Sequence, residues 1–277
     1  MSVVKALWIR NLRAFWRNKP ALLFNLAFPF FFVFVFSSIF QGAIALMLAG
    51  IIIATVFDSS LRVSSNTIDD MTSGFMKEVL VSPISRLTIA VGQFVSSATV
   101  GTVQGLLIYI IGMVLFESVR PENVITVVMV IVSMVFVGLI FAGFGLLIAS
   151  KAKNMQTFQA VSMAITMPMT FISGAYIPLS ALPNALIWVG RFNPMSHAVH
   201  FFRDIALDRP DAEAMTILAM EQEIVFQFWI LTITPMGSII FLVAFGAIFL
   251  TLSTITFTYL DFSKMARNKA DAVDMWN

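Results

Sequence analysis

The chain has 277 residues, of which 59% are apolar and only 12% are charged, with a net charge of +2. A soluble domain carries about 25% charged residues, so the composition excludes an ordinary soluble protein, and its hydrophobicity excludes a disordered one. The absence of cysteine excludes disulfides, thiolate metal ligands and a cysteine nucleophile. The small net charge gives no indication of a nucleic-acid partner.

Residues 1–19 are predicted to form an amphipathic interfacial helix, centred on residues 3–18. At about 100° per residue, apolar and basic side chains separate onto two faces. Such a helix lies in the membrane interface with its basic side chains toward anionic lipid, so we expect membrane lipid to be a partner. It is either a simple anchor or a helix that also contacts a cytoplasmic protein. The apolar face holds Val4, Leu7, Trp8, Leu12, Phe15 and Trp16, and the basic face holds Arg10, Arg13 and Arg17.

Five long stretches without a charged residue lie at residues 20–57, 87–116, 123–150, 154–190 and 224–260. A membrane span needs about 20 apolar residues, so the first stretch is long enough for two spans. One helix is expected near residues 20–40 and a second near 43–62, joined by a very tight loop for which Ser37, Ser38, Gln41 and Gly42 are the candidate turn residues. The stretches predict an all-α integral membrane protein, with one domain over residues 1–277 and six transmembrane helices. No signal peptide is expected, because the first apolar run is too long and lacks a small-residue cleavage site. Spans 1 and 2 are expected within residues 20–63, span 3 at 87–116, span 4 at 124–150, span 5 within 155–203 and span 6 at 224–260.

Polar residues inside the first two spans are candidates for a transport pathway. Asn25 lies in span 1 near Pro29, which would kink the helix, and near a Phe-rich run at residues 28–36. That run is typical of lipid-facing or packing surface, and a wall for an apolar substrate is the alternative. In span 2, Arg62 follows Asp58 by four residues and can neutralise it on the same helix face. The pair belongs either to the pathway or to the structure near the interface.

Glycines in spans 3 and 4 predict close approach between helices, because small residues let helix backbones pack tightly in a membrane. The glycines are Gly101, Gly105 and Gly112 in span 3, and Gly138, Gly143 and Gly145 in span 4.

The inner loop at residues 64–86 is predicted to contain a short amphipathic helix. Residues 69–73 resemble a helix start, and Ser82 before Pro83 ends the helix, because the residue before proline avoids helical geometry. An exposed apolar stripe on a short cytoplasmic helix suggests docking into a groove on another protein, and a helix lying on the membrane surface is the alternative. The stripe consists of Phe75, Met76, Val79 and Leu80.

The segment before the last span is predicted to be re-entrant or interfacial on the outer side. Ser173, Gly174, Pro178, Pro183 and Pro194 divide it into apolar pieces that are too short to cross a bilayer. Irregular backbone at membrane depth is tolerated only against protein or a water-filled cavity, so the segment is a candidate gate, with an outer cap as the alternative. A metal site is not expected: His197, His200 and Asp204 are available, but a zinc site needs a fuller ligand set.

Basic residues predict the orientation. Six spans place both termini on one side, and that side carries 13 of the 17 Lys and Arg residues, against 4 on the other. The positive-inside rule then puts both termini in the cytoplasm. Residues 204–223 are expected to form an outer loop, and residues 261–277 a cytoplasmic tail.

Two motifs give the chain a family resemblance. The inner loop resembles the coupling-helix region of ABC-2 type transporter permeases, closest to the daunorubicin-resistance-like branch, in Gly74, Phe75, Lys77, Glu78, Val79, Leu80, Ser82, Pro83 and Arg86. The outer segment resembles that family's second signature in Ser173, Gly174, Pro178, Leu182, Pro183, Pro194, His197 and Arg203. With the six spans and the N-terminal helix, the resemblance covers nearly the whole chain. Its one departure is the outer loop between spans 1 and 2, which is longer in relatives.

The resemblance implies the transmembrane subunit of an ATP-driven exporter in the prokaryotic cytoplasmic (inner) membrane. Two permease subunits would pair, a homodimer being favoured over a heterodimer, and two copies of a separate ABC ATPase would bind ATP and Mg. A drug or lipid-like substrate that is hydrophobic or amphipathic is the first expectation, and a lipid-linked polysaccharide or teichoic acid is the alternative.

The residues themselves agree on one point: the sequence contains no G-x-x-x-x-G-K-[ST] phosphate loop, so the chain does not bind ATP by that device. Two other classes are disfavoured. An intramembrane enzyme would need a catalytic set such as H-E-x-x-H or G-x-S-x-G, and an ion-coupled carrier would need ionisable groups near the midplane, where only Asp58 comes close. The chain is therefore expected not to be an enzyme.

Overall fold

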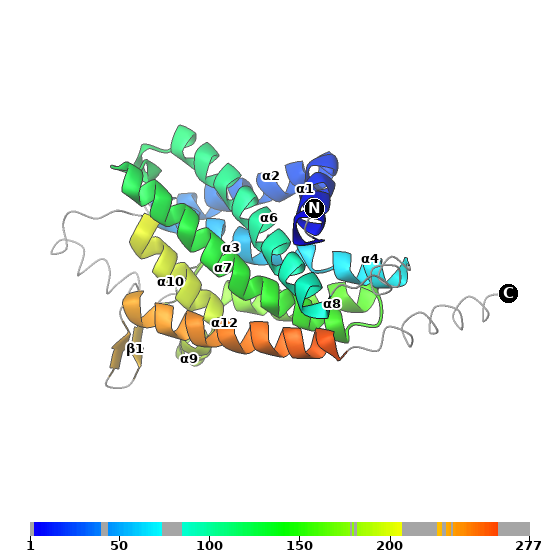
Figure 1. Cartoon of the computed structure of the whole chain (residues 1–277). Coiled ribbons are helices and arrows are strands. Elements are labelled where there is room, and N and C mark those ends of the chain that lie inside the picture. The colour runs from blue at the N-terminus through cyan, green and yellow to red at the C-terminus, as the bar shows by residue number, and fades with distance from the viewer. Residues whose placement is uncertain are drawn as a thin grey trace.

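The computed structural model describes residues 3–39, 44–73, 85–177, 179, 182–206, 226–228, 231–233 and 235–259. Within these ranges the chain is helical apart from one short hairpin and a single 3-10 turn, η1 (Glu117–Val119) (Figure 1). The hairpin strands are β1 (Phe226–Phe228) and β2 (Leu231–Ile233). The helices are α1 (Val3–Arg17), α2 (Lys19–Ile39), α3 (Ile44–Val63), α4 (Asn66–Thr72), α6 (Arg86–Leu115), α7 (Val124–Lys151), α8 (Met155–Phe171), α9 (Asn184–Phe192), α10 (Pro194–Ala206) and α12 (Pro235–Thr258).

Three of the long helices begin with the same side-chain cap. The residue before the helix is Ser85 for α6, Asn123 for α7 and Asn154 for α8, and each accepts a hydrogen bond from the backbone N–H three residues later. Such a cap satisfies one of the unpaired N–H groups at a helix start. The predicted spans 3 and 4 are confirmed as helices, since α6 and α7 begin and end within one residue of the predicted limits.

Helix α3 is the centre of the bundle. It packs against α2, α6, α7 and α10, and its residues 47–57 are buried without interruption. The largest core cluster runs through α3 and gathers side chains from α6, α7, α8, α10 and α12 around it. Figure 1 shows α3 behind α6 and α7, with α10 and α12 along the lower side of the bundle.

Glycines let α6 and α7 approach α3, as predicted. A Cβ built on Gly101 of α6 would lie 2.2 Å from Ser60 Oγ, and one built on Gly145 of α7 would lie 2.8 Å from the Leu61 carbonyl oxygen. Real Cβ atoms do not come this close to such atoms, so the positions exclude a larger side chain unless the helices move apart. Close backbone approach of this kind is how helices associate where the solvent is itself apolar.

The predicted number of six spans is not confirmed. Among the described helices, four stretches are long and apolar enough to cross a membrane: Ile44–Met71, Arg86–Leu115, Val124–Lys151 and Gly237–Thr258. A fifth is obtained if α1 and α2, which meet at 69°, count as one broken span. The predicted fifth span is short, because α8 has 17 residues, about 25 Å at 1.5 Å per residue. Its charge-free stretch is interrupted at Gly174, where Ser173 and Gly174 had predicted a break.

The helices expected near residues 20–40 and 43–62 are found as α2 and α3, which span Lys19–Ile39 and Ile44–Val63. One further boundary was predicted wrongly. The predicted span at residues 224–260 contains the β1–β2 hairpin, in which Phe226 pairs with Ile233, and α12 begins only at Pro235. Proline is favoured in the first turn of a helix, and alternating aromatic and β-branched residues favour strands, so the sequence did carry both signals.

The inner loop also begins differently from the prediction. Residues 69–73 were expected to start the docking helix, but α4 already begins at Asn66 and ends at Thr72. Asp69 and Asp70 therefore lie inside a helix that precedes the predicted one. The docking segment itself, residues 74–84, lies outside the described residues.

We predict that Gly145→Val destabilises the bundle by about 1–3 kcal/mol, the usual range for overpacking a core, because its side chain would meet Ser64 and the backbone of Leu61. Ala247→Val, which adds two of the same three carbons at an exposed position on α12, is the matched control and should change little. Thermal unfolding of the purified protein in detergent measures both. Equal melting temperatures for the two variants would contradict tight α3–α7 packing.

Candidate functional site

The break cluster joins the end of α8 to α10 through buried polar groups; its members are Ser173, Gly174, Asn193, His197 and Arg203. Gly174 has φ of +82°, a left-handed backbone geometry that costs an L-residue energy but not glycine. Its carbonyl oxygen accepts a hydrogen bond from Arg203 Nη2 at 2.7 Å. Arg203 Nε also donates to the Leu46 carbonyl of α3 at 3.0 Å. The guanidinium therefore ties the break to the central helix.

His197 and Asn193 complete this cluster. His197 Nε2 lies 2.9 Å from the Arg191 carbonyl oxygen, and its ring stacks on Phe241 of α12 with the ring centres 4.5 Å apart. Asn193 Nδ2 donates to the Met169 carbonyl oxygen of α8 at 2.6 Å. Buried backbone carbonyls need partners, and here side chains supply them where the helix is interrupted.

Ser238 of α12 is a member that the sequence did not reveal. Its hydroxyl lies 3.2 Å from His197 Nδ1 and 2.9 Å from His200 Nδ1. The two histidines that were weighed as metal ligands in the sequence both contact the same hydroxyl, which links α10 to α12. Among the described residues, no three His, Asp or Glu side chains gather as a metal would require.

The predicted outer-gate residues are therefore brought together in part. Four of them are buried within the bundle of this single chain: Ser173, Gly174, His197 and Arg203. Pro194 begins α10 beside them. Pro183 precedes α9, and Leu182 packs with Leu179 in a small separate cluster. Pro178 lies outside the described residues. A gating role for this set stays a prediction.

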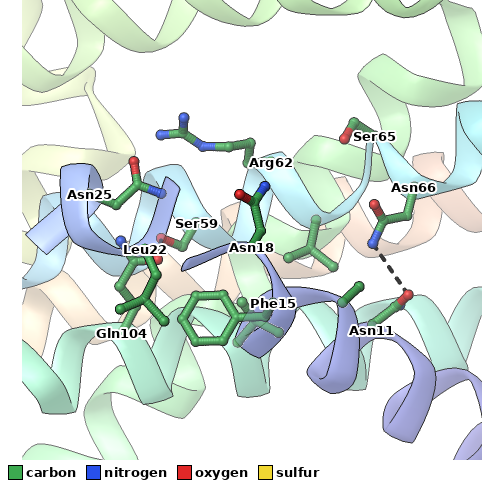
Figure 2. Close-up of a pocket in the computed structure, with 13 residues that line it drawn as sticks. Asn11, Phe15, Asn18, Leu22, Asn25, Ser59, Arg62, Ser65, Asn66 and Gln104 are labelled. Atoms are coloured by element: carbon green, nitrogen blue, oxygen red, sulfur yellow. Dashed lines mark hydrogen bonds between the residues drawn. The ribbon is translucent and has the colours of Figure 1, made fainter. Parts of the chain in front are cut away.

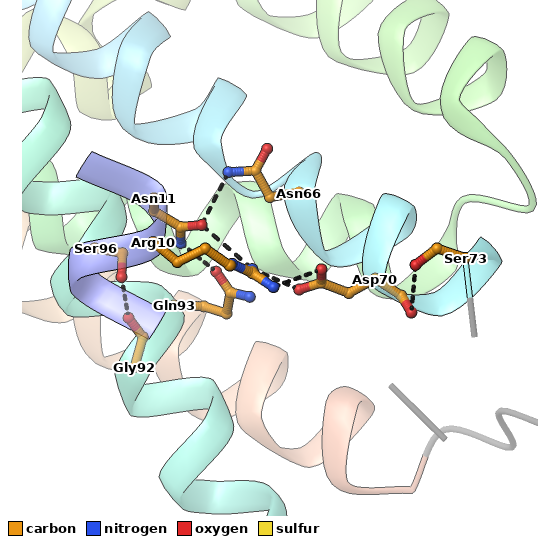
Figure 3. Close-up of polar contacts among 8 residues, drawn as sticks. All are labelled: Arg10, Asn11, Asn66, Asp70, Ser73, Gly92, Gln93 and Ser96. Atoms are coloured by element: carbon orange, nitrogen blue, oxygen red, sulfur yellow. Dashed lines mark hydrogen bonds and ion pairs between the residues drawn. The ribbon is translucent and has the colours of Figure 1, made fainter. Parts of the chain in front are cut away.

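The α1–α4 network is a second polar group, and sequence reasoning missed it; its members are Arg10, Asn11, Asn66, Asp70 and Gln93 (Figure 3). Arg10 makes two hydrogen bonds to the Asp70 carboxylate, at 2.8 and 2.7 Å. Asn11 accepts from Asn66 and donates to Gln93 of α6, both at 3.2 Å. Bidentate pairs of this kind are among the stronger polar contacts. The network fastens the N-terminal helix to the element directly before the docking segment.

Helix α1 is therefore held in place by contacts with other helices of the chain, and not only by contact of its apolar face with the membrane. Leu7 is buried against Gly92 of α6, and Trp8 Nε1 donates to Thr99 Oγ1 at 3.0 Å. The predicted helix is confirmed. However, part of the face that was assigned to lipid packs on α6, while Trp16 stays half exposed. A possible signal was Asn11, an amide among the apolar positions of α1.

The elbow pocket is a third feature, a cavity of about 230 Å³ where α1 meets α2 (Figure 2). Two of the four predicted pathway residues, Asn25 and Arg62, line it, whereas Asp58 and Pro29 do not. The predicted Asp58–Arg62 ion pair is present. The lining residues are Asn11, Ala14, Phe15, Asn18, Leu22, Asn25, Ser59, Arg62, Val63, Ser65, Asn66, Val100 and Gln104.

The predicted coupling residues are described only at Arg86. Gly74, Phe75, Lys77, Glu78, Val79, Leu80, Ser82 and Pro83 lie outside the described residues. Arg86 Nη1 donates to the Thr258 carbonyl at 2.6 Å. A cation at the carbonyl end of α12 interacts favourably with the helix dipole, so this contact anchors the start of α6.

Long apolar helices packed through glycines, with a polar break buried among them, define a multi-pass membrane protein. Residues 2–207 match the ABC-2 type transporter family. The chain belongs to that family, and its role is that of a transport permease. It is similar to a protein of Cyanophora paradoxa that is named as a transport permease, ycf38, with 24% identity over 202 residues, 68% of each chain.

We predict that Arg203→Ala lowers the stability of the bundle by about 2 kcal/mol or more, because it removes the buried hydrogen bond to the Gly174 carbonyl and a second, partly buried one to the Leu46 carbonyl. Arg203→Lys, which keeps one charge but loses the fork, should fall between it and the native protein. Arg120→Ala, at an exposed arginine paired with Glu117, is the control. Melting temperatures in detergent measure all three, and an Arg203→Ala protein as stable as the control would refute the anchoring role.

Proposed function

We propose that the chain is the membrane subunit of an ATP-driven exporter in a prokaryotic inner membrane. Two copies pair, and each binds a separate ABC ATPase through residues 74–84. The cargo is a hydrophobic or amphipathic molecule moved outward. The observation that carries the proposal is the anchoring of the chain on both sides of that docking segment.

The described residues before the segment are tied to α1. Asp70, four residues before position 74, holds Arg10 through two hydrogen bonds, and Asn66 of the same helix contacts Asn11. A displacement of α4 would therefore move α1 with it, because packed helices move as bodies.

The described residues after the segment are tied to α12. Ser85 caps α6, and Arg86 reaches the last turn of α12 through Thr258. Figure 1 places α4 and the end of α12 toward one end of the bundle, and β1 toward the opposite end. A push at residues 74–84 would thus reach α1 and also α12, which runs from this end of the bundle toward β1.

The energy source in this proposal is the partner. The sequence has no phosphate loop, so ATP and Mg would be bound by the ATPase subunit. The excess of basic residues on the side that carries the docking segment supports a cytoplasmic position for that segment and for both termini.

Helix α8 supports pairing with a second copy. Only Phe158 and Ser162 are buried along it, whereas Gln156 and Gln159 are exposed. An exposed helix face of mixed polar and apolar character suits contact with protein better than contact with lipid tails alone. A second copy of this chain would cover α8, and the homodimer would have its transport pathway between the two copies.

We predict that Phe75→Ala combined with Leu80→Ala releases the ATPase, because buried apolar anchors contribute about 2 kcal/mol or more each at an interface. Phe34→Ala with Leu115→Ala removes the same two side-chain types from exposed positions on α2 and α6 and is the control. Pull-down of the co-expressed ATPase in detergent and transport in vesicles are the measurements. An ATPase that stays bound to the first variant and still drives transport would exclude this docking segment.

We predict that Asp70→Asn lowers transport several-fold while the ATPase stays bound, because the variant loosens α4 from α1 without altering residues 74–84. A double-mutant cycle with Arg10→Gln, measured on the free energy of unfolding, should show a coupling energy of about 0.5–3 kcal/mol, as contacting residues do. The exposed pair Glu117–Arg120, treated with Glu117→Gln and Arg120→Gln, should show almost none. Native transport by Asp70→Asn would argue against transmission through α1.

A further inference from the structure

The elbow pocket lies where lipid headgroups would be expected. It is formed at the junction of α1 and α2, beside the exposed basic residues Arg13, Arg17 and Lys19. Trp16, which directly precedes Arg17 in α1, is 49% exposed. Tryptophan and basic side chains on an amphipathic helix mark the membrane–water interface.

Four parts of the chain each present one helix stripe to the pocket. Helix α1 and the junction contribute positions 11, 14, 15 and 18, and α2 contributes 22 and 25. Positions 59, 62 and 63 come from α3, positions 65 and 66 from its junction with α4, and positions 100 and 104 from α6. Spacings of three and four residues place side chains on one face of a helix. The pocket is therefore built into packed elements (Figure 2).

The lining is rich in hydrogen-bond donors and suits an anion. Arg62 is the charged residue among the described lining residues, none of which is a carboxylate, and five of the others are Asn or Gln. Ser59 Oγ donates to Gln104 Oε1 at 2.6 Å, which leaves the Gln104 amide nitrogen as the group that a ligand can use. Asn11 lines the pocket but is not counted as a donor to the ligand, since its amide oxygen and nitrogen both have partners within the protein.

Arg62 keeps donors for a ligand despite its ion pair. Its contact with Asp58 uses Nη2, and a guanidinium has five N–H groups in a fixed fork. Such a fork matches the geometry of phosphate oxygens. The side chain is 57% exposed, so a ligand entering from the interface can reach it.

From these observations we propose that the elbow pocket binds the phosphate group of a glycerophospholipid, with Arg62, Asn25 and Gln104 as the principal donors. The cavity, about 230 Å³, is smaller than sites for whole drug-sized ligands, which are about 300–1,000 Å³, so it accommodates a headgroup and not the acyl chains. The chains leave the pocket along α2 at Phe28, an exposed apolar residue one turn after Asn25. This apolar contact favours a lipid over free phosphate.

The site goes beyond transport itself and does not depend on the ATPase or on pairing. It gives each permease chain a lipid contact at the joint between its interfacial helix and α2. A lipid held there would bridge α2, α3 and α6 at the headgroup level, opposite the wall formed by Asn11.

The test is lipid binding to the purified permease without its ATPase. Native mass spectrometry would measure binding of phosphatidylglycerol, phosphatidylethanolamine, diacylglycerol with the same acyl chains, and inorganic phosphate. We expect both phospholipids to bind at least 10-fold more tightly than diacylglycerol, because only they carry the phosphate. Diacylglycerol binding as tightly as the phospholipids, or inorganic phosphate binding where phospholipid does not, would overturn the proposal.

Variants localise the binding. Arg62→Gln and Asn25→Leu should each weaken phospholipid binding about 10-fold, the equivalent of about 1.4 kcal/mol. Arg120→Gln is the matched control, since Arg120 is 54% exposed and is also paired with a carboxylate on a neighbouring turn, and it should bind as the native protein does. The melting temperature without added lipid shows whether each variant is folded. If Arg62→Gln is not folded, the binding measured for Asn25→Leu decides the test. Unchanged binding by folded Asn25→Leu would refute the site.

Discussion

The burial of α3 is the constraint on which the other features depend. Residues 47–57 of α3 are enclosed by four other helices, so their surroundings must be close-packed and the polar groups along the buried part of the helix must find partners. Glycines on α6 and α7 meet the first demand at Gly101 and Gly145. Ser59 and the Leu46 carbonyl meet the second through Gln104 and Arg203. Both the elbow pocket and the break cluster are therefore built against the same helix, one toward each end.

Polar contacts fix two regions of the permease: the interrupted segment inside the bundle, and the elements on either side of residues 74–84. Arg203 and His197 hold the interrupted segment to α3 and α12 from inside the bundle. The Arg10–Asp70 pair and the Arg86–Thr258 contact hold the elements on either side of residues 74–84. Bidentate or buried contacts of this type resist displacement better than exposed pairs. In the proposed exporter, force applied between α4 and α6 would thus be passed to α1 and α12 rather than absorbed locally.

The amphipathic N-terminal helix has two roles that its sequence does not separate. Leu7 and Trp8 pack on α6, so half of the apolar face is an internal contact. Trp16 and the basic residues remain outside, which is where an interfacial helix meets lipid. The bend of 69° between α1 and α2 turns the chain from one environment to the other, and the elbow pocket lies in that bend.

The sequence by itself determined the membrane class, the limits of α6 and α7, the interruption at Gly174 and the pairing of Asp58 with Arg62, because hydropathy, capping residues and helical spacing are local properties. It did not determine how many charge-free stretches cross the membrane, because an absence of charge does not fix the length of a helix: α8 covers 17 residues of the stretch 154–190, and α12 begins only at Pro235 in the stretch 224–260. Nor could it place Arg10 on Asp70, Arg203 on Leu46 or Ser238 between two histidines. These contacts join residues 60, 157 and 38 or 41 positions apart, and such separations are bridged only when the helices have folded against α3.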